Sequence, residues 1–431
     1  MSTEENQTPS PLPMEPIKVD NLLIGFTSEF QRIWDNRRSR SQPCSFWRPT
    51  PTADLLPGFF PLGDLAHPGL DSIDGKRVVA VVSDDHSQNT DGAKAKALRP
   101  PTDFELVWRS AGSRTDADCT IWRPIPPDGY VALGLVCADR DKPSLNTVRC
   151  VRADLVIGAF VGKLIWNDKD SGAKQDFSAW SVQPPAAAAG EVYFAPGSFI
   201  GVEGHARPAT NLPAYSLRMQ IPVQVNPPPK APTLSGQKQP LPVEAVRVTQ
   251  IARLPWFTIT DPDLPALEQT RTSPFYRMER TDKYILVGYS HNTGTEAQTV
   301  KWKVPRLQSS EKLQAFAHAS SVEFAGQWPM KPDSGPITFS ARLSHDFAHT
   351  ESTSSNWFDS AETEFLALVA KNKAMAAYLM QSDYKLLREN GTEVTTGVSF
   401  TEVSSLYLTE FTTEEEPDPL SDPPTVRDTA P

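Results

Sequence analysis

Three carboxylates in one short stretch are the residues whose types and spacing best fit a metal site. Asp168, Asp170 and Asp176 lie between Trp166 and Trp180, and a glycine follows the second of them. Alternating carboxylates in a loop with a glycine are how calcium loops supply hard oxygen ligands. The full acidic motif of such a loop is missing, however, and a lysine lies inside the stretch. Asx turns account for the same aspartates, so turn formation is favoured and a calcium site is the alternative.

The sequence lacks the usual patterns of catalytic residues. It has no GxSxG, HExxH, P-loop or GxGxxG segment, and no histidine accompanies a nucleophile motif. The four cysteines occur singly, without a CxxC pair, which argues against a zinc site and against a disulfide framework. We therefore expect a protein that is not an enzyme, with no catalytic residues and no cofactor apart from the calcium considered above.

Composition excludes further classes of protein. The chain has 431 residues, 41 prolines and a net charge of −10. Nucleic-acid binding needs clustered lysine and arginine, so the acidic balance argues against it, and the proline content favours short strands and turns over helices. No run approaches the roughly 18 apolar residues of a transmembrane helix, and residues 1–16 lack the apolar core of a secretory signal. We expect synthesis in the cytoplasm, with release towards target membranes possible.

A threefold repeat spans the first half of the chain. Each copy has a tryptophan that ends an apolar segment and a second tryptophan 13 or 14 residues later: Trp34 and Trp47, Trp108 and Trp122, Trp166 and Trp180. Four short β-branched or aromatic segments per copy, bounded by turn residues, predict about twelve strands in total. This pattern fits a β-prism-like domain, with a β-trefoil as the alternative. The tryptophans are expected to form its core, and the other interpretation is a set of exposed platforms for sugars or lipid headgroups.

Two motifs in the repeat region resemble a known family. Residues 142–155 (KPSLNTVRCVRADL) are similar to the signature of the vacuolar protein sorting-associated protein 62 family, and residues 165–173 (IWNDKDSGA) are similar to a second signature. The resemblance covers about residues 20–220 and implies a β-rich, prism-like module without known catalytic residues. The third copy departs from the pattern after Trp180, where Pro184–Gly190 (PPAAAAG) replaces the expected segment. That departure puts a ligand site on this face in doubt.

The remaining chain divides into a linker, a second domain and a tail. Prolines crowd residues 223–244, so we expect an extended connector there. Residues 1–20 and the acidic, proline-rich residues 412–431 are expected to be disordered. Between them, residues 21–222 form the repeat domain and residues 245–411 an elongated antiparallel β-domain. Ala367–Met380 could be helical by propensity, but β-like flanks favour two strands around Lys371–Lys373.

An alternating pattern at residues 313–350 predicts a hairpin that could enter a membrane. Two stretches alternate apolar and small polar residues on either side of an apolar turn, and transmembrane strands need about 9–11 residues in such alternation. The candidate insertion residues are Phe316, Val322, Phe324, Trp328, Met330, Ile337, Phe339, Leu343 and Phe347. A half-buried antiparallel sheet shows the same alternation and is the favoured alternative.

The second half also resembles the carboxy-terminal region of aerolysin-type pore-forming proteins. The resemblance covers residues 270–411, with Ser273–Tyr276 at the start and Tyr384–Thr392 near the end, and it is one of layout. It implies an elongated β-domain that oligomerises on a membrane. His318, His345 and His349 lie in the predicted hairpin. Because histidine titrates between pH 5 and 8, they are candidates for an acid switch, although polar surface positions in a sheet are favoured.

The sequence thus predicts an all-β protein with a prism-like domain followed by an aerolysin-like one. The leading hypothesis is a membrane-directed binding protein that forms a β-barrel pore as a defence or insecticidal toxin, with a homo-oligomer on the membrane and a lectin-like domain that binds a lipid or glycan receptor. The alternative is an intracellular adaptor in vacuolar sorting or membrane traffic that forms no pore. Nucleic acid is not an expected partner.

Overall fold

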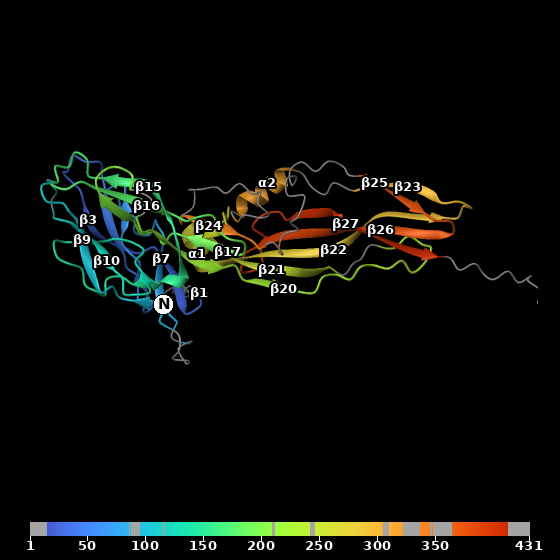
Figure 1. Cartoon of the computed structure of the whole chain (residues 1–431), viewed down its shortest axis with the longest axis horizontal. Helices are drawn as coiled ribbons and strands as arrows, with labels where there is room; N and C mark the ends of the chain where they lie inside the picture. The colour runs from blue at the N-terminus through green and yellow to red at the C-terminus, as the bar shows by residue number, and fades with distance from the viewer. Residues whose placement is uncertain are drawn as a thin grey trace, which may run out of the picture.

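The computed structural model is an elongated, almost entirely β-stranded molecule (Figure 1). It describes residues 15–85, 87, 95–113, 115, 117–208, 212–241, 246–304, 310–320, 322, 337–344, 347 and 364–412. The prism-like head comprises residues 17–220 and lies at one end, and the tail, residues 223–412, extends away from it. Within the described residues, every helix is too short or too polar to span a bilayer. The predicted fold class, all-β with antiparallel sheets, is confirmed.

Each of the three repeats of the head folds into two small sheets of its own. Repeat 1 comprises β1 (Ile17–Val19), β2 (Leu22–Thr27), β3 (Phe30–Asp35), β4 (Ser45–Pro49), β5 (Phe60–Pro61), β6 (Leu65–His67) and β7 (Val79–Asp84). Repeat 2 comprises β8 (Leu98–Arg99), β9 (Asp103–Arg109), β10 (Thr120–Ile125), β11 (Tyr130–Val131), β12 (Val136–Ala138) and β13 (Cys150–Arg152). Repeat 3 comprises β14 (Val156–Gly158), β15 (Phe160–Asn167), β16 (Phe177–Gln183), β17 (Glu191–Phe194), β18 (Ile200–Glu203) and β19 (Tyr215–Gln220).

Strand pairing distinguishes the two folds that the sequence left open. The sheets are β1-β2-β7-β5 and β3-β4-β6 in repeat 1, β11-β13-β8 and β12-β10-β9 in repeat 2, and β14-β19-β17-β24 and β15-β16-β18 in repeat 3. Among the described residues, no strand of one repeat pairs with a strand of another. A closed barrel needs continuous pairing around its circumference, so separate sheets around a common axis favour the prism-like arrangement over the trefoil.

A ring of backbone hydrogen bonds joins the three repeats at this axis. The N–H of Asp64 donates to Leu135 O (2.8 Å), that of Leu135 to Phe199 O (3.0 Å), and that of Phe199 to Asp64 O (3.2 Å). Gly63 and Gly134 allow the close approach, because a Cβ on Gly63 would lie 2.8 Å from the Gly134 Cα. Each repeat therefore holds the next one, and the third closes the ring on the first.

A second ring is made by the first tryptophan of each repeat. Trp34, Trp108 and Trp166 contact one another edge to face, with ring centroids 6.1–6.3 Å apart. Their indole N–H groups point around the axis: Trp34 donates to Ala117 O (2.9 Å), Trp108 to Gln175 O (2.9 Å) and Trp166 to Gln42 O (2.8 Å). Each tryptophan thus contributes apolar burial and also satisfies a carbonyl of the neighbouring repeat.

The second tryptophans are buried as well. Trp47, Trp122 and Trp180 are 4%, 7% and 6% exposed. Each donates its indole N–H to a hydroxyl two residues earlier, at 2.8–2.9 Å, and a cation lies over each ring: Arg32, Lys142 and Arg207 respectively. The interpretation of the six repeat tryptophans as core is confirmed, and the one as exposed stacking platforms is wrong.

The tail is built on one long antiparallel sheet. Its order is β20-β21-β22-β26-β27, formed by β20 (Val223–Val225), β21 (Arg247–Pro255), β22 (Phe275–Asn292), β26 (Lys373–Leu387) and β27 (Val398–Thr412). A two-stranded sheet of β23 (Gln298–Lys303) and β25 (Glu364–Val369) contacts its far end (Figure 1). β25 and β26 meet at Lys371–Asn372, so the two strands predicted around these residues are confirmed.

Two short helices and a proline-rich segment complete the tail. They are α1 (Ala266–Thr272), α2 (Ser310–Ala319) and the linker after β20. 3₁₀ turns occur at Ala153–Leu155 in the head and at Trp256–Thr258 after β21. Leu234 of the linker packs on Ala374, Ala376 and Tyr378, so this connector covers one face of the long sheet.

The described residues of the predicted insertion hairpin, 313–320, 322, 337–344 and 347, do not pair with one another as a hairpin. The prediction of its first strand is wrong, because Ser310–Ala319 forms the helix α2. The buried residues Leu313, Phe316 and Ala319 are spaced three apart, which puts them on one face of this helix. In the described part of the second predicted strand, residues Phe339–Arg342 form β24, and β24 pairs with β17 of the head. Alanine, leucine, glutamate and lysine favour the helix locally.

Closure of the head at its axis should not tolerate a side chain at Gly63. We expect Gly63→Ala to lower the free energy of unfolding by about 1–3 kcal/mol, because its Cβ would press on backbone atoms of repeat 2. Gly158→Ala is the matched control, since that Cβ would meet no atom within 4 Å. Urea unfolding measures both, and equal stability of the two variants would contradict the close-packed axis.

Candidate functional site

One apolar core runs through the boundary between head and tail. Trp256 and Phe257, in the 3₁₀ turn after β21, contact Phe26 of β2 with ring centroids 5.3 and 5.7 Å apart, and Phe257 lies 4.8 Å from Phe194 of β17. Leu217 of the head and Tyr276 of the tail belong to the same buried cluster. The two parts are therefore joined by a shared interior, which we call the junction core.

A strand from the tail extends a sheet of the head at this junction. β24 pairs antiparallel with β17, placing Ala341 opposite Val192 and Phe339 opposite Phe194. The N–H of Ala195 donates to Thr338 O (2.8 Å), and the Ser340 hydroxyl accepts the N–H of Ala187 (2.8 Å). The third repeat thus uses the free edge of its outer sheet to hold a segment whose neighbours in sequence belong to the tail.

Residues 310–320, 322, 337–344 and 347 lie between β23 and β25 in the sequence, and we call them the junction segment. The segment is attached at three further points. The N–H of Thr260 donates to Ala319 O (2.8 Å), a β-bridge links Ser320 to Ile259, and Arg280 Nη1 donates to Phe347 O (3.0 Å). Its contacts therefore reach both the head and the base of the long sheet.

The structure places six of the nine candidate insertion residues in or against the junction core. Phe316, Val322, Ile337, Leu343 and Phe347 are buried in it, and Phe339 packs half-buried against Phe257. Phe324, Trp328 and Met330 lie outside the described residues. The sequence pattern thus identified apolar residues that gather in space, although their present environment is protein.

The three candidate switch histidines are not brought together in the described part of the chain. His318 is exposed on α2, and His345 and His349 lie outside the described residues. Their role in an acid switch stays a prediction.

Sequence reasoning missed two buried ion pairs at the base of the tail. Arg388 makes two hydrogen bonds to the fully buried Asp261 carboxylate, at 2.8 and 2.7 Å, and Tyr276 donates a third at 2.9 Å. Arg280 pairs with Asp282 (2.9 Å), beside the bond that it donates to the junction segment. Asp261 and Arg388 are over 100 residues apart in the sequence, and Arg280 and Asp282 are two apart. No local sequence pattern predicts either pair.

Hydrogen bonds keep two buried carboxylates, those of Asp261 and Glu191, ionised. Burial alone would raise the pKa of Asp261, but the bonds from Arg388, the Asp263 N–H and Tyr276 hold it below its ordinary value. The same balance lowers the pKa of Glu191, which is buried on β17 and bonded to Arg218, Tyr193 and Gln220. Both acids are therefore ionised throughout the physiological range.

The predicted calcium residues are partly brought together. Asp168, Asp176 and His205 have ligand atoms within 4.8 Å of one another, whereas Asp170 is exposed in the adjoining turn and is not part of this group. Asp168 already accepts the N–H of Phe177 (2.8 Å), the indole N–H of Trp108 (3.1 Å) and a contact from His205 Nε2 (2.7 Å). Asn36 and Ser110 accept the corresponding backbone N–H in repeats 1 and 2. The geometry fits a hydrogen-bonded structural cap better than the many oxygen ligands of a calcium site.

One seam between neighbouring repeats, that of repeats 3 and 1, holds an open, mostly apolar groove. The groove has a volume of about 590 Å³ and is lined by Pro43, Pro68, Leu70, Leu164 and Ile165, with Gln42 and Asn167 among its polar lining residues. Its size is in the range of small-molecule sites, which makes it the head's candidate receptor groove.

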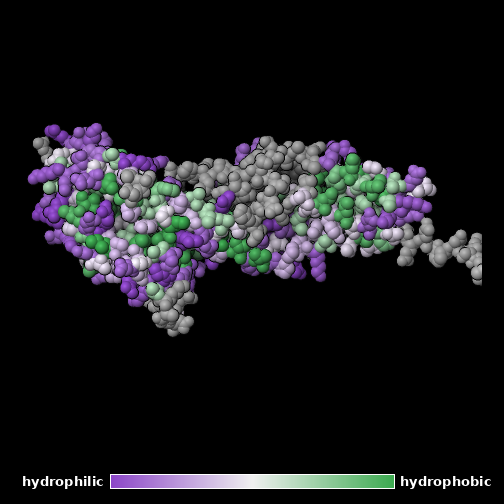
Figure 2. Space-filling view, in the orientation of Figure 1, coloured by the Kyte–Doolittle hydropathy of each residue, from purple (hydrophilic) through white to green (hydrophobic). Residues whose placement is uncertain are grey.

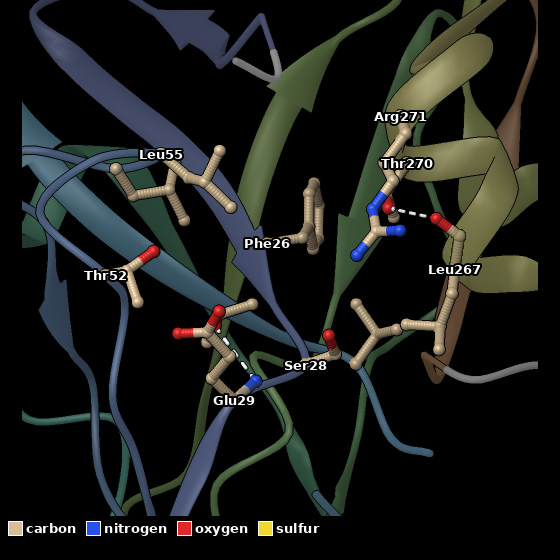
Figure 3. Close-up of a pocket in the computed structure, with 11 residues that line it drawn as sticks. Phe26, Ser28, Glu29, Thr52, Leu55, Leu267, Thr270 and Arg271 are labelled. Carbon is tan, nitrogen blue, oxygen red and sulfur yellow. Dashed lines mark hydrogen bonds between the residues drawn. The ribbon is translucent and has the colours of Figure 1, made fainter. Parts of the chain in front are cut away.

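A smaller pocket lies where the head meets α1. Figure 3 shows Phe26, Thr52 and Leu55 of the head facing Leu267 and Arg271 of the helix. Its volume of about 60 Å³ suits a few water molecules and not a ligand of the usual 300–1,000 Å³ class. We interpret it as an imperfection in the packing between head and tail.

The Asp261–Arg388 pair gives a pH-dependent test of this junction. Because the folded-state pKa of Asp261 is lowered, its stabilisation is complete above its unfolded-state pKa of about 4 and is lost as the pH falls through the lower folded value. We expect Asp261→Asn to cost about 3 kcal/mol of unfolding free energy at pH 7, and the same at pH 5. Urea unfolding at pH 7, 5 and 3 measures the difference from the wild type. A difference that closes between pH 7 and pH 5 would contradict the assignment.

Two solved structures show weak similarity to this chain. The crystal structure of GNIP1Aa from Chromobacterium piscinae is 22% identical with a TM-score of 0.37, covering 46% of this chain, which spans only 38% of that one. The crystal structure of Cry35Ab1 is 9% identical with a TM-score of 0.36, covering 73% of this chain and 89% of that one. Similarities this weak carry no argument about fold or function.

The sequence comparison is more specific. No curated protein matches the chain. Residues 9–220 match the family described as vacuolar protein sorting-associated protein 62, which agrees with the resemblance of residues 20–220. The head of this chain is therefore similar to the vacuolar protein sorting-associated protein 62 family over residues 9–220.

Proposed function

We propose that the protein is a membrane-directed, non-enzymatic binding protein whose junction segment leaves the junction core and enters a lipid bilayer. In this proposal the head selects a lipid or glycan receptor through its apolar seam groove. Several copies of the tail then assemble a β-barrel pore. The observation that carries the proposal is the way in which the apolar residues of the junction segment are connected to the rest of the tail.

That connection makes the segment separable. It enters the core after β23 and leaves it before β25, and these two strands pair with each other over six residue pairs. The five-stranded sheet takes no strand from it. Release would therefore break the β17–β24 pairing, the attachments at Ala319, Ser320 and Phe347, and the packing of the segment's side chains. Both tail sheets would stay paired.

The energetic balance supports a change of environment. The five buried candidate insertion residues of the segment would each lose about 1.5–3 kcal/mol of burial free energy on exposure to water. Exposure in solution is therefore strongly unfavourable, and the segment is held in place. A bilayer offers the same side chains another apolar environment, so membrane contact removes most of that penalty.

The competing function is an intracellular adaptor in vacuolar sorting or membrane traffic. It is favoured by the name of the family that the head resembles. An adaptor needs no release of the junction segment and should form no SDS-resistant rings on liposomes, whereas a pore former should form them.

A disulfide between β17 and β24 tests the proposal. Val192 and Ala341 are directly opposite, and antiparallel neighbours have Cα atoms about 4.5–5.5 Å apart, within the range that a disulfide spans. We expect oxidised Val192→Cys/Ala341→Cys to lose dye release from receptor-bearing liposomes and to regain it with reductant. The four native cysteines are buried, which limits competing pairs.

The matched control keeps the cysteine at Val192 and pairs it with the neighbouring strand on the opposite edge of β17. Val192 is also opposite Met219 of β19, so Val192→Cys/Met219→Cys locks two strands of the head and leaves β24 free. This variant should release dye in both redox states. Equal release by both oxidised variants would show that β24 stays in place, and absence of release by the wild type on every membrane would leave the adaptor function.

A further inference from the structure

Two side chains of the long sheet hold Phe347, the last described residue of the junction segment. Arg280 Nη1 donates a hydrogen bond to Phe347 O (3.0 Å), and the Tyr384 hydroxyl donates to the same oxygen (3.4 Å). The rings of Phe347 and Tyr384 contact each other with centroids 6.1 Å apart. All three residues are at most 5% exposed. We call the pair formed by Arg280 and Tyr384 the Phe347 seat.

The seat is built by the long sheet itself. Arg280 of β22 and Tyr384 of β26 are directly opposite in the strand register. The Asp282 carboxylate accepts a hydrogen bond from Arg280 Nε (2.9 Å) and another from the Thr249 hydroxyl of β21 (2.8 Å). Three neighbouring strands therefore orient the guanidinium, and none of them belongs to the junction segment.

One guanidinium connects the sheet to the segment. Its Nε is bonded to Asp282 and its Nη1 to Phe347 O, an arrangement that the planar fork of arginine permits. Hydrogen bonds from a charged donor are stronger than those between neutral groups. Departure of Phe347 would break such a bond and would also expose a ring that is fully buried.

The position of the seat along the chain makes it relevant to β24. Phe347 comes shortly after Arg342, the last residue of β24. A short tether keeps two binding elements at a high effective concentration. While Phe347 stays in its seat, β24 therefore remains near β17 and re-forms the pairing whenever the two strands separate.

We infer that the Phe347 seat is an autoinhibitory latch that regulates departure of the junction segment from the junction core. This inference rests on the proposed membrane-directed function and deepens it, because it names the contact that must break before β24 leaves β17 for good. Arg280 acts through Phe347 and is thus a positioning residue for the segment.

Thiol labelling in solution tests the latch without a membrane. Ala341→Cys puts a thiol at a fully buried position of β24, and the four native cysteines are buried as well. The rate at which a maleimide labels the introduced thiol reports how often the segment opens. We expect Arg280→Lys in this background to raise that rate about tenfold or more, because lysine keeps the charge but lacks the second arm of the fork.

Arg388→Lys in the same background is the matched control. Arg388 also bonds a buried aspartate at the base of the tail, Asp261. Among the described residues, its other hydrogen bonds go to Asp263, Thr392 and Glu393, outside the junction segment. This variant should lower the stability of the tail and leave the labelling rate unchanged. Equal rises in both lysine variants would overturn the inference, because general destabilisation would then explain the opening.

A second variant keeps the test decisive if Arg280→Lys does not fold. Phe347→Ala retains the bond between Arg280 and Asp282, removes the buried ring and should also speed labelling. Its control is Leu366→Ala, which truncates a side chain that is 70% exposed. Leu366 belongs to β25, and Figure 2 shows hydrophobic residues gathered at the surface near this end of the tail. The control should label at the parent rate, and an unchanged rate in either seat variant that folds would overturn the inference.

The failures of the two proposals are distinguishable. Faster labelling of the seat variants, together with no dye release by the wild type on any membrane, would support the latch and reject the pore. Dye release by the wild type, together with unchanged labelling of the seat variants, would reject the latch and leave the pore.

Discussion

The closed ring of backbone hydrogen bonds at the axis of the head is the constraint on which the rest of the structure depends. Asp64, Leu135 and Phe199 each donate to the next repeat, and the tryptophan ring repeats this closure one layer away. With all three repeats tied at the axis, their outer sheets have fixed positions. The outer edge of β17 is thereby held where the tail can pair with it.

The irregular third repeat is explained by this attachment. β5 and β11 have two residues each, whereas the corresponding β17 has four and pairs with β24. The unusual Pro184–Gly190 stretch leads directly into β17, and Ala187 and Gly190 donate hydrogen bonds to the junction segment. The departure of the third repeat from the pattern is thus the site where the head binds the junction segment.

Features that depend on residues close together in the sequence could be predicted from it. The repeated tryptophans predicted the head's strands and core, and the turn at Lys371–Asn372 separated β25 from β26 despite alanine-rich flanks. α2 was missed because Phe316, His318 and Ser320 alternate with small residues as in a strand, whereas the buried Leu313, Phe316 and Ala319 recur every three residues, as in a helix. The pairing of β24 with a strand about 150 residues earlier, and the contact of Arg388 with Asp261, depend on tertiary structure that no local pattern encodes. The candidate insertion residues were recognised as apolar, but their shared buried site was not.

The central claim is that the junction segment can leave the head while both tail sheets stay intact. Hydrogen exchange measured by mass spectrometry, on the full chain with and without receptor-bearing liposomes, tests it most directly. The account predicts that amides of β24 and of the facing edge of β17 lose protection on the membrane, while those of β22, β26 and the axial ring keep it. Unchanged protection of β24 on a membrane to which the protein binds would contradict the account.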